Sequence, residues 1–271
     1  MTFVSNKIFL LVVIFAANLF SQNTLEQQFD YANQFLNQEK YYDAITELKR
    51  LQFFDKQNIY SFQSNLLIGK SYKAGAKFDE AVKYLTLAEI NAKSDEEYFA
   101  AKTLNARTNI LRRTTKQAER ILNDLLIDPR FKSNEKEIKY WIGWNYIFSD
   151  DWEKAYEIFN ENNLDTTLAN LCKSVGDEMY SVDFAKYSSY IIPGFGQFYT
   201  GEYISGALSL GWNILFGYLT INAFVEDRIF DAIIIGNFFW LRFYSGNIQN
   251  AEKFAKQKNL EISNKALEYL Q

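Results

Sequence analysis

Small and apolar residues recur at a fixed interval along the first two thirds of the chain. Alanines stand at positions 44, 81, 118 and 155, which gives a spacing of 37 residues. A second series of small residues keeps the same spacing: Ala32, Gly69, Ala106 and Gly143. The apolar residues around each pair predict two helices joined by a tight turn, whose small residues let the helices approach closely. One such unit cannot bury its apolar face alone, so the pattern predicts stacked units.

The second unit carries the pattern most completely, with Ile68, Gly69, Tyr72, Phe78, Ala81, Leu85 and Ala88. The first and fourth units keep the same phase, whereas the third has Asn109 where an aromatic residue is usual. This pattern resembles the tetratricopeptide repeat, although the period is 37 rather than about 34 and most units lack a closing proline. The resemblance implies an α-solenoid of about four units over residues 24–163.

The same resemblance implies a groove, lined by the first helix of each unit, that binds a protein or peptide partner. The groove-facing positions are Phe29, Asn33, Lys70, Lys73, Arg107, Tyr140 and Trp144. Three of them, Asn33, Lys70 and Arg107, resemble part of the carboxylate clamp of peptide-terminus readers, but Phe29, Leu66 and Thr103 stand where that clamp has lysines. Alternatively, these residues are the solvated face of ordinary charged helices, which needs no ligand.

The last third contains 23 consecutive uncharged residues, Tyr203 to Val225. At about 1.5 Å per residue they form a helix of about 34 Å, long enough for a hydrocarbon core of about 30 Å. A second apolar stretch, residues 229–244, crosses only if Arg242 reaches the interface and Asp231 stays at the turn. The polar residues 226–228 between the stretches predict a hydrophobic, membrane-associated helical hairpin, with lipid as a partner. A hairpin buried in the protein or lying at the membrane surface is the alternative.

A glycine-rich segment precedes this hairpin. Its residues Pro193, Gly194, Gly196, Gln197, Tyr199 and Gly201 resemble the Pro-Gly-x-Gly-Gln-x-Tyr signature of small bacterial two-helix membrane domains, most of them uncharacterised. The resemblance covers about the last 80 residues. It implies a membrane location and no reaction.

The amino terminus has the layout of a secretory signal peptide over residues 1–21: Lys7, an apolar stretch over residues 8–17, and the small Ser21. An uncleaved anchor is the alternative. We therefore expect a protein exported to the cell envelope, membrane-associated, with its repeats on the periplasmic side. The complete expected order is all-α: signal peptide 1–21, repeats 24–163, a helical connector 164–187 broken near Gly176, the hairpin 188–246 and a C-terminal helix 247–271.

Composition narrows the function. A net charge of −4 offers no electrostatic footprint for nucleic acid, and the absence of histidine removes the commonest acid–base catalyst and zinc ligand. Cys172 is the only cysteine, and its apolar surroundings predict a buried thiol. No cofactor and no metal is expected.

The sequence thus favours a non-enzymatic envelope scaffold or adaptor that binds a protein or peptide. One alternative is an accessory of membrane-protein biogenesis or transport in which the hairpin is the working part. An enzyme would need paired carboxylates such as Asp150 with Asp151, or Glu135 with Glu137, which on such helices and turns are more often solvated surface.

Overall fold

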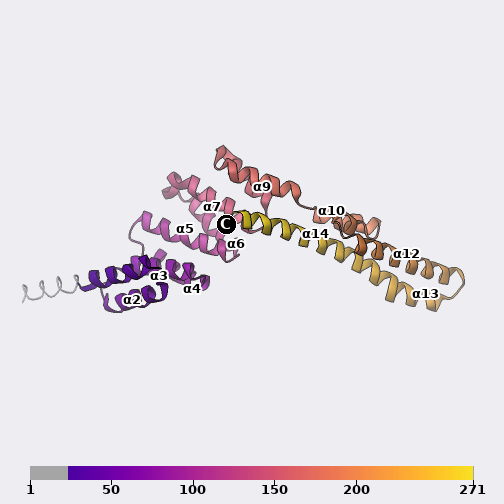
Figure 1. The fold of residues 1–271 in the computed structure, drawn as a ribbon, viewed down its shortest axis with the longest axis horizontal. Helices are drawn as coiled ribbons and strands as arrows, with labels where there is room; N and C mark the ends of the chain where they lie inside the picture. Colours follow the sequence, from indigo (N-terminus) through magenta and orange to yellow (C-terminus); the bar gives the residue numbers. More distant parts are fainter. Residues whose placement is uncertain (1–23, 271) are drawn as a thin grey trace, which may run out of the picture. The chain divides into compact units, whose positions relative to one another are not determined.

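The structure, a computed structural model, describes residues 24–270, and the expected signal peptide lies outside them. Every regular element in these residues is helical, which confirms the all-α class (Figure 1). The chain divides into two compact units, the first ending at Ala169 and the second beginning at Asn170. The division falls a few residues after the expected end of the repeats.

The first unit is an array of consecutive packed helices that starts with helical residues 24–37. Its further elements are α2 (Tyr41–Phe54), α3 (Ser61–Ala74), α4 (Phe78–Asn91), α5 (Asp95–Leu111), α6 (Thr115–Ile127), the 3-10 turn η1 (Pro129–Asn134), α7 (Glu135–Phe148), α8 (Trp152–Asn160) and the short η2 (Glu161–Asn163). Each helix packs against the next in sequence, and α3, α5 and α7 also contact one another in succession. The array is therefore repeat-like, with alternate helices forming one layer.

One backbone turn joins the two helices of all four expected units. Its central residue has a left-handed conformation, with φ between 55° and 62°, at Glu39, Ala76, Arg113 and Asp150. The next amide donates to the carbonyl five residues before it, as from Lys40 N to Phe35 O at 2.9 Å and from Asp151 N to Tyr146 O at 3.0 Å. This closure satisfies carbonyls at the helix end. The turn recurs every 37 residues although a non-glycine residue in this conformation costs about 1–2 kcal/mol.

The small residues allow close helix contact, as the sequence predicts. A Cβ atom at Gly69 would lie 2.8 Å from Leu85 Cδ2, and one at Gly143 would lie 2.5 Å from Phe159 Cζ. Leu85 and Phe159 are themselves fully buried, and they belong to a further series of buried residues at the same spacing: Leu48, Leu85, Leu122 and Phe159. The first and second helices of each unit therefore meet where one side chain fills the space left by a small residue.

The third unit replaces the usual aromatic with a buried polar network. The side-chain Nδ2 of Asn109 donates to Asn105 Oδ1 at 2.9 Å, and Asn109 Oδ1 accepts from Thr114 Oγ1 at 2.8 Å. Asn105 in turn donates to Glu89 Oε1 at 2.6 Å. The weak sequence pattern in this unit thus reflects hydrogen bonds in place of ring packing.

The second unit contains helices that follow α9 (Thr166–Glu178), itself crossing the division between the units. They are α10 (Val182–Ile191), α11 (Phe195–Tyr199), α12 (Tyr203–Val225), α13 (Ile229–Ile235), the π-helical segment η3 (Gly236–Trp240) and α14 (Leu241–Tyr269). Helices α12 and α13 run back along each other as a hairpin (Figure 1). Their turn repeats the closure of the first unit, with Asp227 at φ 55° and Arg228 N donating to Ala223 O at 2.9 Å.

Two boundaries differ from expectation. The connector breaks a few residues after Gly176, at residues 179–181. There Asn259 bonds both the amide and the carbonyl of Tyr180, at 2.8 and 2.9 Å, and so satisfies its non-helical backbone. The expected C-terminal helix 247–271 does not begin as a separate element, because α14 is continuous from Leu241. Its buried face, including Ala251 and Ala255, belongs to a helix that packs against α10.

Candidate functional site

Five of the seven expected groove residues line two cavities on the layer formed by α3, α5 and α7. The first cavity, about 530 Å³, is lined by Lys70 and Arg107 among others. The second, about 290 Å³, is lined by Lys73, Arg107, Tyr140 and Trp144 together with the apolar Ile110, Leu111, Trp141 and Phe148. Arg107 lines both cavities, which makes it the centre of the candidate groove.

The other two expected residues lie elsewhere. The ring of Phe29 stacks on Tyr60 with centroids 5.0 Å apart and packs against the core of the first two units. Asn33 is half-buried and lines neither cavity. The structure therefore brings together the residues of the second, third and fourth units, and the binding role of all seven stays a prediction.

Arg107 and Lys73 carry charges that the described residues leave without an ion pair. The guanidinium of Arg107 lies over the ring of Trp141, 4.1 Å from its centroid. Burial lowers the pKa of Arg107, while Glu137 and Tyr140 oppose this shift. Burial, and after it the charge of Arg107, lowers the pKa of Lys73. Two like charges thus lie half-buried beside aromatic rings, where a bound anion would relieve both the repulsion and the loss of hydration.

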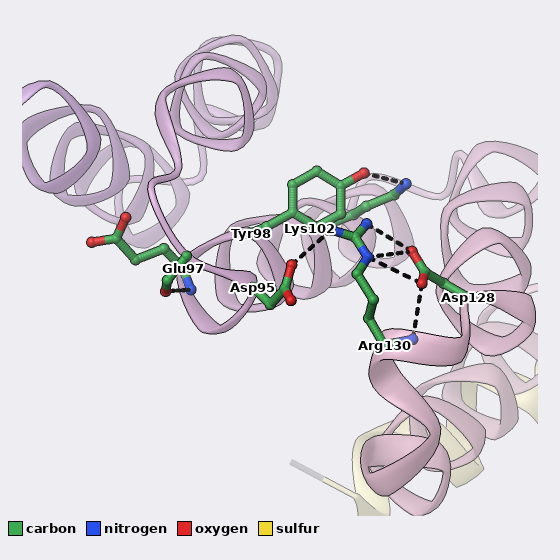
Figure 2. A network of polar contacts seen from close by, with 7 residues as sticks. Asp95, Glu97, Tyr98, Lys102, Asp128 and Arg130 are labelled. Carbon is green, nitrogen blue, oxygen red and sulfur yellow. Dashed lines mark hydrogen bonds and ion pairs between the residues drawn. The ribbon is translucent and has the colours of Figure 1, made fainter.

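The wall of the larger cavity is held by an ion-pair network around Arg130 (Figure 2). Arg130 donates to Asp95 Oδ1 at 2.7 Å and to Asp128 Oδ2 at 2.8 Å, so it ties the 3-10 turn η1 to the start of α5. Its charge is therefore already compensated. Thr103 lines the same cavity, and its buried hydroxyl has no hydrogen-bond partner among the residues described.

Sequence reasoning missed Trp141, Thr103 and Arg130. The signal for Trp141 is present, because it precedes Trp144 by three residues on one helix face. Thr103 stands at a position where the carboxylate clamp has a lysine, which is a sequence signal for its place in the groove. No comparable signal marks Arg130, since its place in the wall depends on how α5 and η1 meet.

The carboxylates considered for catalysis mostly have structural partners. Asp151 caps α8 by accepting from Lys154 N at 3.2 Å and pairs with Lys154 Nζ at 2.6 Å. Asp150 pairs with Arg113 at 3.6 Å, and Glu135 with Lys139 at 2.8 Å. Such contacts fix turns and helix ends, and Lys139 Nζ also pairs with Glu161 at 2.7 Å.

In the second unit, the glycine-rich motif forms a buried contact centred on Asn247 of α14. Asn247 Oδ1 accepts from Gly194 N at 2.6 Å and from Gln197 Nε2 at 3.1 Å, and Asn247 Nδ2 donates to Ser189 O at 2.9 Å. Gln197 is fully buried. Because Asn247 lies about 50 residues further along the chain, this network is a long-range lock on the motif.

The glycines of this motif allow the backbone to pack closely around the same contact. Gly194 has a φ of 93°, and a Cβ there would lie 2.3 Å from Gly206 O. A Cβ at Gly196 would lie 2.2 Å from Ala185 O. The hydroxyl of Tyr199 accepts from Ser181 N at 3.0 Å, and Gly201, with a φ of 80°, turns the chain into α12. Together with Gln197, five motif residues thus position α11 against α10, α12 and α14, whereas Pro193 stands at the turn before Gly194.

Comparison with protein-family models, with curated proteins and with solved structures found no match for this chain.

One helix among residues 24–270, α12, is long and apolar enough to cross a membrane. Only 22% of its most apolar 18-residue window is buried. Its outward-facing apolar side chains include Ile204, Ile214, Tyr218 and Val225, and the apolar exposure continues at Phe230 and Phe238 of the returning arm. The core helix of a water-soluble protein would have most of this surface covered.

Proposed function

We propose that this protein is a non-enzymatic scaffold of the cell envelope: a tetratricopeptide-like solenoid that binds a protein or peptide segment in the groove of α3, α5 and α7, and is anchored in the membrane by the α12–α13 hairpin. The main support for a binding groove is the pair Lys73 and Arg107, which are half-buried and have no ion pair in the described chain. Both lie beside the aromatic rings of Tyr140, Trp141 and Trp144.

This surface favours a partner segment that carries a carboxylate next to an apolar or aromatic side chain. A carboxylate can form charge-assisted hydrogen bonds with Arg107, and it gains more there than in water because the site is partly desolvated. The aromatic rings offer flat apolar area with little conformational entropy to lose. Lys70, exposed at the larger cavity, lies on the same helix as Lys73 and adds attraction for an acidic segment.

The exposed apolar surface of α12 and α13 supports the anchor. In water such a surface would be a large unfavourable patch, whereas in lipid it has its matching solvent. The charge of Arg228 at the hairpin tip is compensated, since Arg228 pairs with Glu226 at 2.9 Å and with Asp231 at 3.3 Å. Export through an amino-terminal signal peptide, with the repeats on the periplasmic side, completes this proposal and stands on the sequence alone.

The groove is tested with the full chain in detergent and a set of fluorescent eight-residue peptides that vary in acidic and aromatic content. We expect peptides with both features to bind, and R107Q to weaken binding about tenfold, because hydrogen bonds to charged groups are individually strong. K116Q removes one positive charge from exposed Lys116 of α6, away from the cavities, and is the matched control. If R107Q and K116Q lose peptide affinity equally, the effect comes from net charge alone. If both variants bind the peptides as the wild type does, the proposed binding role of the groove is wrong.

The anchor is tested by washing isolated membranes with alkaline carbonate, which strips peripheral proteins. Retention in the pellet supports spanning helices, and release contradicts them. Replacing residues 203–244 with an unrelated hairpin then separates the scaffold from the alternative role in biogenesis or transport. The internal roles of Gly194, Gly196 and Gln197 favour an anchor, so we expect function to survive the exchange.

A further inference from the structure

A cavity of about 580 Å³ lies between α12 and α14 in the second unit, close to the start of α12. Its polar lining includes Arg242, Ser205, Ser209 and Asn250, and its apolar lining includes Leu208 and Trp212. Leu208 and Trp212 are 55% and 41% exposed, so the cavity opens onto the apolar surface of α12. It therefore combines one cation and several hydrogen-bonding groups with an apolar approach.

Arg242 has no carboxylate within ion-pair distance in the part of the chain that the structure describes. Other cations of the second unit differ in this respect. Lys186 and Lys256 pair with Glu252 at 2.9 and 2.5 Å, and Arg228 pairs with Glu226 at the hairpin tip. The acidic group that also lines the cavity, Glu202, is 3.6 Å from Lys258 Nζ. The carboxylate at the rim is thus partly neutralised by another cation.

The lack of a carboxylate partner matters because of where Arg242 lies along the hairpin in the proposed bilayer. The ring of its chain neighbour Phe243 stacks on Trp212 with centroids 5.6 Å apart, so Arg242 lies near the level of Trp212. Trp212 is about 14 Å along α12 from Tyr203, at about 1.5 Å per residue. In the other direction, the uncharged stretch between Asp231 and Arg242 measures about 15 Å, half of a hydrocarbon core. A guanidinium at that depth needs an anion or water.

We propose that this cavity binds the phosphate of a phospholipid headgroup, an inference that rests on the proposed membrane anchoring of the hairpin. Arg242 would hold the phosphate by paired N–H donors, which suit its geometry. Ser209 Oγ already accepts from Gln197 Nε2 at 3.2 Å, which leaves its own hydrogen to donate, and Ser205 and Asn250 supply further donors. An acyl chain would follow Leu208 and Trp212 along α12.

The phosphate is an anion that the bilayer itself supplies, in the headgroup layer nearest to Arg242. Drawing it down to Arg242 locally thins one side of the membrane, which matches the unequal apolar lengths of the two arms of the hairpin. A lipid also explains why polar donors and exposed apolar side chains line one cavity. A soluble anion would accept hydrogen bonds from the donors but would not contact the apolar lining formed by Leu208 and Trp212.

The test is native mass spectrometry of the full chain purified in detergent and supplied with phosphatidylglycerol. We expect one lipid to stay bound to the wild type and R242Q to reduce retention about tenfold, as for loss of a charge-assisted contact. R242K should retain an intermediate amount because a lysine lacks the paired donors. R228Q, which removes an arginine already paired at the tip, is the matched control and should retain lipid as the wild type does.

Equal lipid retention by the wild type and R242Q, when both resist carbonate washing, would overturn this inference and leave the anchor intact. Displacement of the lipid by excess inorganic phosphate would identify a soluble anion as the ligand and would also overturn it. Release of the wild type by carbonate would overturn the membrane anchor and this cavity together. Should R242Q lose its helical circular dichroism, R242K carries the comparison, and unchanged retention in that variant counts against the proposal.

Discussion

Replacing Gly143 with alanine should destabilise the first compact unit, the part of the described chain that ends at Ala169, through one contact. Gly143 lies within α7, and an added Cβ would lie 2.5, 2.7 and 2.8 Å from three atoms of the Phe159 ring. Phe159 is fully buried, with Tyr140 at its edge at a centroid distance of 5.8 Å, so the ring has no space to swing away. The helices α7 and α8 must therefore separate slightly or Phe159 must leave its preferred rotamer.

Two terms set the size of the effect. Alanine in a helix interior gains about 1 kcal/mol over glycine, and overpacking a well-filled core costs about 1–3 kcal/mol. The net loss should therefore be up to about 2 kcal/mol in the free energy of unfolding. Gly75, the C-cap of α3, is the control in the same unit, since a Cβ there would meet nothing closer than 3.6 Å. We expect G75A to be neutral or mildly stabilising.

The assay is urea unfolding of the full chain followed by tryptophan fluorescence. Trp212 and Trp240 are replaced by phenylalanine, so that the signal comes from the three tryptophans of the first unit. A shift of the midpoint at constant slope reports stability. F159L should restore about 1–2 kcal/mol in a double-mutant cycle, because a smaller side chain relieves the clash. If G143A is as stable as G75A, or F159L gives no coupling, the close contact is wrong.

Three further predictions follow from buried groups. Burial raises the pKa of Glu89 above its usual 4.5, against the hydrogen bond from Asn105, so its contribution to stability is present below pH 4.5 and is lost as the pH rises through the folded value. E89Q keeps the acceptor for Asn105 but does not titrate. The urea midpoint of E89Q should therefore rise relative to that of the wild type as the pH goes from acidic to neutral. A difference between the two midpoints that stays constant with pH would contradict the raised pKa of Glu89. G196A should cost more than about 2 kcal/mol, because the clash with Ala185 O is with backbone, whereas G211A, with nothing within 4 Å, should be neutral or stabilising; limited proteolysis of the second unit compares them. Cys172 is fully buried, which confirms the predicted buried thiol, so a maleimide should modify it only after unfolding, and rapid labelling of the folded chain would place it at the surface.

The sequence by itself determined the helices, their phase and the uncharged span. The spacing of 37 placed Ala44, Ala81, Ala118 and Ala155 at positions that are all fully buried, and it located the small residues at which the helices meet. These features are local, because helical periodicity decides which face of each helix is apolar. The length of α12 was equally readable, since its bounds, Tyr203–Val225, are those of the uncharged stretch.

Only the tertiary structure decided which groove residues adjoin and what holds the glycine motif. Lys73 and Arg107 belong to separate helices, and their shared cavity depends on how α3, α5 and α7 pack. The lock between Gly194 and Asn247 joins residues 53 positions apart. The continuation of α14 past residue 246 depends on burial against α10. Such contacts arise between faces of different helices, and periodicity along one helix carries no information about which distant face will cover it.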